Sequence, residues 1–339
     1  LDLKTQGRTG LEIKASAKGY VSRIKIQRFG YGKALYITHP NGYTTVYAHL
    51  KKFAPEIEDY VKAYQYDQES YEVQLFPSPN KLPVKSGEII AYSGNTGSSG
   101  GPHLHFEIRD SQSRPMNPFL FGFEEVKDTK PPRVRSIYAF TASADAHINF
   151  KRGRIKLRTI KSRNGNLKVP EIKAAGDIYF GIEAYDQLDF ALNRNGYYQV
   201  EAKLNGLDFF TSTFKRFAFS ETRYLNRLID YGYYREHKRR IHKLRSYDYK
   251  RLEINHNPIN NGILQIDDTL NYKYDLKIKD FKGNTTQIHI PISYKPLGQN
   301  IKDSVAKTNY HVKHDHAFAY DKGLVDIYIP KHALYNDAY

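Results

Sequence analysis

The sequence of 339 residues contains no cysteine and no tryptophan. The absence of cysteine excludes disulfides, thiolate metal sites and cysteine nucleophiles. It leaves the redox compartment open, because a cysteine-free protein suits either side of a membrane. The sequence also lacks any run of about 18 apolar residues, the length that a membrane-spanning helix needs. These residues are therefore not expected to contain a membrane span.

The N-terminus carries no secretory signal pattern. It opens at Leu1-Asp2-Leu3-Lys4, without a methionine and without a polar lead-in. We therefore expect this sequence to be the processed or partial form of a longer protein.

Positive charge is in excess, with 52 Lys and Arg against 36 Asp and Glu and a net charge of +16. A basic surface attracts polyanions, and nucleic acid, anionic cell-envelope polymers and lipopolysaccharide all satisfy that description. No nucleic-acid-binding motif is recognisable, so no nucleic-acid partner is expected.

Residues 1–123 have the pattern of short strands separated by glycine turns. Tyrosine and phenylalanine, which favour strands, number 29 and 18 in the whole sequence. Pro40-Asn41-Gly42 is a hairpin signal between two of the predicted strands. The predicted strands are residues 19–26, 34–38, 43–47, 88–92 and 104–109.

One stretch departs from this strand pattern. Residues 55–66 begin with proline, have acidic residues in the first turn and carry apolar residues at helical spacing. We predict that residues 53–81 are an insertion with one helix and an extended return over residues 72–76.

The second half of the sequence predicts another β domain. Residues 124–132 contain the paired prolines Pro131 and Pro132 and are predicted to be a linker. The strand spacing over residues 133–295 suits an immunoglobulin-like β-sandwich. Residues 296–339 are predicted to be a linker and the start of a further β element. The strands expected are residues 134–140, 178–185, 197–204, 209–214, 272–279 and 287–292, with a helical or irregular excursion over 221–245. The fold class expected is therefore mainly β.

The motif His103-Leu104-His105 lies in a predicted strand. Strand alternation puts both imidazoles on one face and Leu104 on the other. Neutral imidazole is a good zinc ligand and a good acid or base near neutral pH. Taken alone, the pair would more often be two surface histidines.

The surrounding residues resemble the lysostaphin- and LytM-type metallopeptidases, which cleave peptidoglycan peptides. The glycine-rich stretch 94–102 precedes the histidine pair, and Phe106-Glu107-Ile108-Arg109 follows it. The family's Tyr-Ala-His-Leu run stands here as Tyr47-Ala48-His49-Leu50, and residues 9–21 and 83–94 also match the family pattern. The resemblance covers residues 1–123. It implies a LytM-like β-sheet peptidase domain and an extracytoplasmic location in the periplasm, in the cell envelope or outside the cell.

The resemblance also implies roles for individual residues. Asp2 and His105 would be Zn²⁺ ligands, and a third ligand histidine is expected upstream of Leu1. His103 would be the general base, and His49 would hold the attacking water and stabilise the oxyanion. The implied function is zinc-dependent endopeptidase activity on peptidoglycan stem peptides or cross-links, provided that the upstream histidine exists.

Three alternatives remain open at this point. The LytM-like domain could be catalytically inactive and bind the wall or activate other hydrolases. The chain could instead be an adhesion or scaffold protein in which the β-sandwich has the main role. The insertion over residues 53–81 could form a wall of the substrate groove, or it could be a peripheral decoration.

Other charged segments give weaker signals. The basic run over residues 235–245 could contact an anionic polymer or be a solvated face. His311, His314 and His316 have metal-ligand residue types, with surface histidines as the plainer interpretation. Asp186 and Asp189 are predicted to be turn residues, with a calcium site as the lesser alternative.

Overall fold

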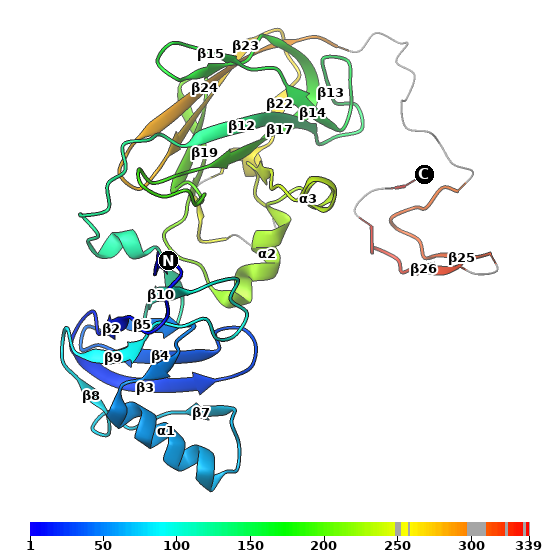
Figure 1. Ribbon diagram of the computed structural model, residues 1–339. Helices are drawn as coiled ribbons and strands as arrows, with labels where there is room; N and C mark the ends of the chain where they lie inside the picture. The colour runs from blue at the N-terminus through cyan, green and yellow to red at the C-terminus, as the bar shows by residue number, and fades with distance from the viewer. Residues whose placement is uncertain (248–251, 257, 297–309, 323–324, 335–336, 339) are drawn as a thin grey trace.

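The computed structural model describes residues 1–338 with gaps at 248–251, 257, 297–309, 323–324 and 335–336. The fold is mainly β, as predicted, with two large sheets and a few short helices. Figure 1 shows the N-terminal sheet in blue and the larger sheet in green to orange. Within the described residues, no helix has the length and apolarity needed to cross a membrane.

The N-terminal sheet is built from antiparallel neighbours. Its predicted strands are confirmed to within two residues at each end, whereas its first strand was not predicted. In spatial order the strands are β1 (Asp2–Lys4), β10 (His103–Arg109), β5 (Thr44–Ala48), β4 (Lys33–Thr38), β3 (Gly19–Ile26) and β7 (Val73–Leu75). The sequence therefore begins on an edge strand beside the one that carries His103 and His105.

A second, three-stranded sheet packs against this one. It has the order β2 (Glu12–Lys14), β9 (Ile89–Tyr92) and β6 (Lys52–Phe53). Its fully buried side chains include Phe53 and Ile90, which belong to one core with Leu35 and Leu104. Burial of such a side chain stabilises the fold by about 1.5–3 kcal/mol.

The predicted helix is confirmed as α1 (Pro55–Asp67), with proline in its first turn. It buries Ile57 and Val61 against the N-terminal core. The strand that follows, β7, pairs with β3 at one edge of the sheet, and β3, β4 and β5 separate it from β10. This arrangement favours the peripheral interpretation of the segment over a wall beside the histidines.

The larger sheet contains all six strands predicted for the second domain. Its main path runs through β14 (Arg154–Leu157), β12 (Arg133–Thr141), β17 (Ile172–Tyr185), β24 (Thr285–Tyr294), β23 (Asn271–Lys279), β18 (Gln199–Leu204), β19 (Leu207–Thr213) and β21 (Asn255–His256). Ile137, Phe180, Tyr274 and Ile290 belong to its core. The immunoglobulin-like topology of this region stays a prediction.

Strand β17 changes partners along its length. Residues 172–174 pair in parallel with β24, whereas residues 178–185 pair antiparallel with β12. Gly176 lies between the two parts at a φ of 72°. A Cβ atom on Gly176 would lie 2.7 Å from the Cα atom of Ala146, so both the backbone angle and the space require glycine.

The remaining elements are short. The predicted excursion contains α2 (Thr222–Arg227) and α3 (Tyr231–His237), and β25 (Phe318–Lys322) pairs with β26 (Val325–Ile329). Much of the linker predicted after residue 296 lies outside the described residues. The other strands and 3-10 helices are β8 (Pro83–Val84), β11 (Pro115–Met116), β13 (His147–Ile148), β15 (Ile160–Lys161), β16 (Leu167–Lys168), β20 (His242–Lys243), β22 (Leu264–Ile266), η1 (Pro118–Phe121), η2 (Phe219–Glu221) and η3 (Ile259–Gly262).

Candidate active site

Pairing of β1 with β10 places Asp2 directly opposite His105. Oδ1 of Asp2 lies 2.9 Å from Nδ1 of His105 and 3.7 Å from Nε2 of His103. Leu104, between the two histidines, is buried in the core, while both imidazoles remain half-buried. The alternation predicted for His103-Leu104-His105 is therefore present, and it brings both rings to the Asp2 carboxylate.

His49 joins the same group from the end of β5. Its ring centroid lies 4.8 Å from that of His103 and 5.9 Å from that of His105. The backbone of His49 has a φ of 59°, an uncommon conformation for a residue with a side chain. The chain turns here against Gly94, where a Cβ atom would lie 2.6 Å from the carbonyl oxygen of His49. The structure thus gathers Asp2, His49, His103 and His105 in one place.

Backbone carbonyls fix the protons on two of the rings. Nδ1 of His49 lies 2.8 Å from the carbonyl oxygen of Thr96, and Nδ1 of His103 lies 2.8 Å from that of Gly101. A carbonyl oxygen can only accept a hydrogen bond, so each Nδ1 must donate. In a neutral ring, the Nε2 atom then keeps its lone pair and can accept a proton.

Glu107 contacts the second ring nitrogen of His105, a role that was not predicted from the sequence. Its Oε1 lies 2.8 Å from Nε2 of His105 and also accepts a hydrogen bond from the Tyr31 hydroxyl. Its Oε2 accepts from Nε of Arg109 at 2.7 Å. Burial raises the pKa of Glu107, but the hydrogen bonds from His105 and Tyr31 and the charge of Arg109 outweigh burial and lower it to about 2. The carboxylate is therefore ionised.

The strand pattern carries a signal for Glu107, because it follows His103 and His105 at the same two-residue spacing on β10. Tyr31 has no such signal. Its ring stacks on that of His105, with centroids 5.2 Å apart, from a loop before β4. Only the fold shows that Tyr31 belongs to the site.

The pKa shifts of the other site residues follow from burial and pairing. Burial lowers the pKa of His105, but its hydrogen bonds to Glu107 and Asp2 outweigh burial and raise it. Burial raises the pKa of Asp2, but the hydrogen bond and charge of His105 outweigh it and lower the pKa. Burial lowers the pKa of His49, so this ring is neutral near pH 7.

The donor set suits zinc. Asp2 and His105 offer a carboxylate oxygen and an imidazole nitrogen 2.9 Å apart. The second nitrogen of His105 faces the Glu107 carboxylate, the arrangement that zinc-binding histidines commonly have. The third ligand histidine, expected upstream of Leu1, stays a prediction.

The weaker sequence candidates have other partners. Nε2 of His311 and Nδ1 of His314 lie 2.9 and 2.7 Å from the Asp337 carboxylate, and all three side chains are exposed. His316 bonds to Asp315. These contacts are ordinary surface hydrogen bonds between residues that precede β25 and follow β26, far in the sequence from the four site residues.

The N-terminal region matches the model of a known protein family. The model of Peptidase family M23 matches residues 2–66 and 78–118. Residues 67–77 alone interrupt the match, a shorter segment than the insertion predicted over residues 53–81. Most of α1 therefore falls within the family pattern.

Two curated relatives and one solved structure illustrate the similarity. The DD-carboxypeptidase/endopeptidase Mpg of Neisseria meningitidis is 36% identical over 109 residues, which are 32% of this chain and 19% of Mpg. Lysostaphin of Staphylococcus simulans is 28% identical over 117 residues, 33% of this chain and 19% of lysostaphin. The solved catalytic domain of that antimicrobial peptidase is 24% identical, with a TM-score of 0.25, over 34% of this chain and 71% of that domain. The match thus spans about a fifth of the curated relatives' length.

Proposed function

Because residues 2–66 and 78–118 match the model of Peptidase family M23, we propose that this region is a zinc-dependent endopeptidase that cleaves peptidoglycan stem peptides or cross-links. The observation that carries the proposal is the contact of Asp2 with His105, flanked by His49 and His103. Relatives named as an endopeptidase and as lysostaphin support the reaction class. An extracytoplasmic location follows, because peptidoglycan lies there, and a net charge of +16 suits an anionic envelope.

Asp2, His105 and the histidine expected upstream of Leu1 would hold the metal. When bound, zinc would supply a water of lowered pKa and polarise the scissile carbonyl. In the neutral ring, Nε2 of His105 donates a hydrogen bond to Glu107, and Nδ1, which lies beside Asp2, would then offer its lone pair to the metal. This second contact sets the tautomer that a ligand histidine needs.

His103 is suited to the role of general base. Its Nδ1 donates to the carbonyl oxygen of Gly101, which fixes the ring and leaves Nε2 to take a proton. That Nε2 atom lies 3.7 Å from Asp2, so it is next to the proposed metal position. The proton can later pass from Nε2 to the leaving amine.

The hydrogen bonding of His49 makes its proposed role more specific. A neutral ring with Nδ1 donating to Thr96 presents a lone pair at Nε2. In this state His49 can accept a hydrogen bond from water and orient it. Stabilising an oxyanion would require His49 to gain a proton during the reaction.

The test uses the full-length protein, loaded with zinc, on purified peptidoglycan. We expect release of peptide fragments by the wild type and loss of about 100-fold or more of the rate in His103→Ala. His289→Ala is the matched control, because this exposed histidine on β24 pairs with Asp275 far from the site in the sequence. Equal rates in His103→Ala and the wild type would contradict the role of His103.

The same experiment decides between hydrolysis and a non-catalytic wall-binding module. Such a module would bind peptidoglycan without releasing fragments and without stoichiometric zinc. Asp2, His49, His103 and His105 are all present and adjacent, which favours the enzyme. Elemental analysis of the purified protein supplies the independent measurement.

A further inference from the structure

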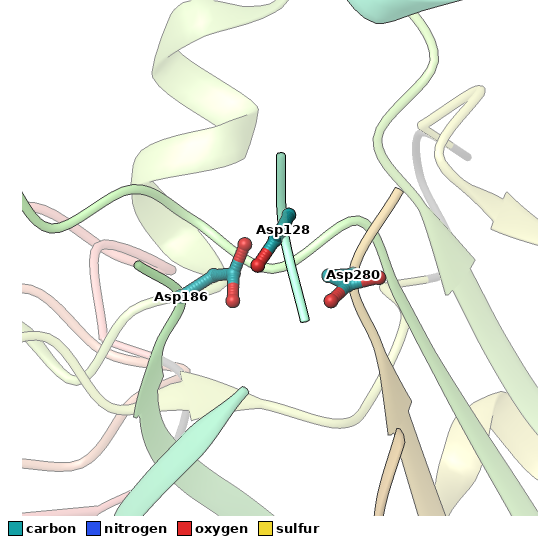
Figure 2. Close-up of side chains that lie close together, drawn as sticks. All are labelled: Asp128, Asp186 and Asp280. Atoms are coloured by element: carbon teal, nitrogen blue, oxygen red, sulfur yellow. The ribbon is translucent and has the colours of Figure 1, made fainter. Parts of the chain in front are cut away.

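Three carboxylates converge between the two large sheets, outside the histidine site. Asp128 comes from the segment that joins the sheets, Asp186 directly follows β17, and Asp280 directly follows β23. One oxygen from each lies within 4.8 Å of the others. Figure 2 shows the three side chains turned toward a common point.

Two of these carboxylates are buried without charge compensation. Asp186 is 6% exposed and Asp280 is 1% exposed. Oδ1 of Asp186 has no hydrogen-bond partner in the described part of the chain. Over the same residues, no lysine, arginine or histidine forms an ion pair with any of the three. A buried carboxylate in this state is unfavourable unless a cation joins it.

The neighbouring polar groups hold the carboxylates in place without neutralising them. The side-chain amide of Asn284 donates to Oδ2 of Asp280 at 2.7 Å and to the backbone oxygen of Asp128 at 2.9 Å. The ammonium group of Lys130, in the same segment, donates to the backbone oxygens of Leu188 and Asp189 instead. The fold thus positions three acidic groups and directs the available ammonium elsewhere.

Burial and the neighbouring charges both disfavour the ionised form of Asp186. Burial, with the charges of Asp128 and Asp280 beside it, raises the pKa of its carboxyl to about 7. A divalent cation would remove that cost. Asp128 and Asp186 also line a cavity of about 500 Å³, which gives an ion a path to them.

We propose that Asp128, Asp186 and Asp280 bind one Ca²⁺ ion. Calcium prefers carboxylate oxygens at about 2.4 Å, so two of its ligands can lie at most about 4.8 Å apart. The three oxygens lie within this limit of one another, and calcium tolerates irregular oxygen coordination, whereas magnesium requires near-ideal octahedral geometry. Backbone oxygens and water complete such a site in proteins.

The second residue suggested by the sequence, Asp189, is not part of this group. Its carboxylate accepts hydrogen bonds from the backbone nitrogen and the hydroxyl of Thr129, at 3.1 and 3.2 Å for Oδ1. Asp128 and Asp280 take its place, from distant parts of the chain. A bound ion would therefore tie residues 124–132 to the ends of β17 and β23.

The test is calcium titration of the chelator-treated full-length protein, followed by calorimetry and thermal unfolding. We expect one Ca²⁺ per chain at this site and a rise in Tm of several degrees, with a weaker response to Mg²⁺. Asp186→Asn should weaken calcium binding at least tenfold, and without calcium it should unfold no earlier than the wild type because a repulsion is removed. Asp275→Asn, at a half-exposed residue of β23, is the matched control and should bind normally.

The His105→Ala variant separates this site from the proposed peptidase site, since its calcium response should be unchanged. A purely structural role would instead make Asp186→Asn unstable without calcium and leave no calcium response in the wild type. That result, or a calcium response that persists in both Asp186→Asn and Asp280→Asn, would overturn the proposal. An equal response to Mg²⁺ would overturn the choice of calcium.

Discussion

Nε2 of His105 lies 2.8 Å from Oε1 of Glu107, while Nδ1 of the same ring lies 2.9 Å from Oδ1 of Asp2. One imidazole therefore bridges two carboxylates. The buried carboxylate, that of Glu107, also binds Tyr31 and Arg109 and is held in its ionised form. We infer that Glu107 orients the ring and that Nδ1, beside Asp2, is the atom that would bind the proposed metal.

This bridge predicts that Glu107→Gln weakens zinc binding by about 10- to 100-fold, because loss of the outer carboxylate removes the fixed tautomer. Competition with a chromophoric chelator measures the affinity. Glu12→Gln, an exposed residue of β2, is the matched control. Unchanged zinc affinity in Glu107→Gln would show that the contact has no orienting role.

The close approach at Gly94 predicts that Gly94→Ala both destabilises the protein and lowers peptidase activity. The added Cβ atom would lie 2.3 Å from the backbone nitrogen of Lys51 and 2.6 Å from the carbonyl oxygen of His49. We expect a loss of about 1–3 kcal/mol in the free energy of unfolding, measured with urea. Gly100→Ala, where a Cβ atom meets nothing within 4 Å, should change neither quantity. A Gly94→Ala protein with normal activity would mean that the turn of His49 tolerates displacement.

His242, half-buried with its Nε2 atom enclosed, predicts a specific pH dependence of stability. Burial lowers its pKa to about 4, and its Nδ1 contacts the Tyr197 hydroxyl. The unfolded chain gains a proton below about pH 6.5, whereas the folded chain resists until about pH 4. The stability contributed by neutral His242 is therefore complete above pH 6.5 and is lost as the pH falls toward 4.

Between pH 7 and pH 5 this loss amounts to about 2 kcal/mol in the free energy of unfolding. His242→Gln cannot titrate, so its stability should fall by correspondingly less over the same interval. Urea unfolding of both proteins at the two pH values gives the comparison. Parallel pH profiles would show that His242 does not contribute.

The edge position of α1 predicts that its core contacts serve stability and not catalysis. Ile57 is 5% exposed, and Ile57→Ala should lower the free energy of unfolding by about 2–5 kcal/mol. The rate per folded, zinc-loaded molecule should remain unchanged. Tyr66→Ala, at a side chain 81% exposed, should affect neither. A lower rate in either variant at full folding would restore the groove-wall interpretation.

Local patterns in the sequence were sufficient for much of the fold. Alternation over residues 19–26 predicted β3 with its observed limits, and proline with acidic residues predicted α1 to within one residue at its end. Both signals act within a few neighbouring residues. The same alternation placed His103 and His105 on one face, and the resemblance to the metallopeptidases added Asp2 and His49.

The features that escaped prediction depend on contacts between distant residues. Tyr31 reaches His105 only because β4, β5 and β10 are neighbours. Asp128 and Asp280 meet Asp186 only after β17, β23 and the segment before β12 are assembled. Sequence periodicity does not predict such long-range contacts. It indicates which face of a strand or helix a residue occupies, but not which residue of another element packs against it.

The partner exchange within β17 has a consequence for how the larger sheet unfolds. One strand of 14 residues is hydrogen-bonded at its start to β24 and at its end to β12, so neither set of strands can separate while β17 stays intact. Local opening should therefore be confined to the short outer strands, and the rest should open in a single cooperative step. In native-state hydrogen exchange, the amides of Ile178, Phe180 and Ile182 should be among the last to exchange, and at the same rate as their partners in β12.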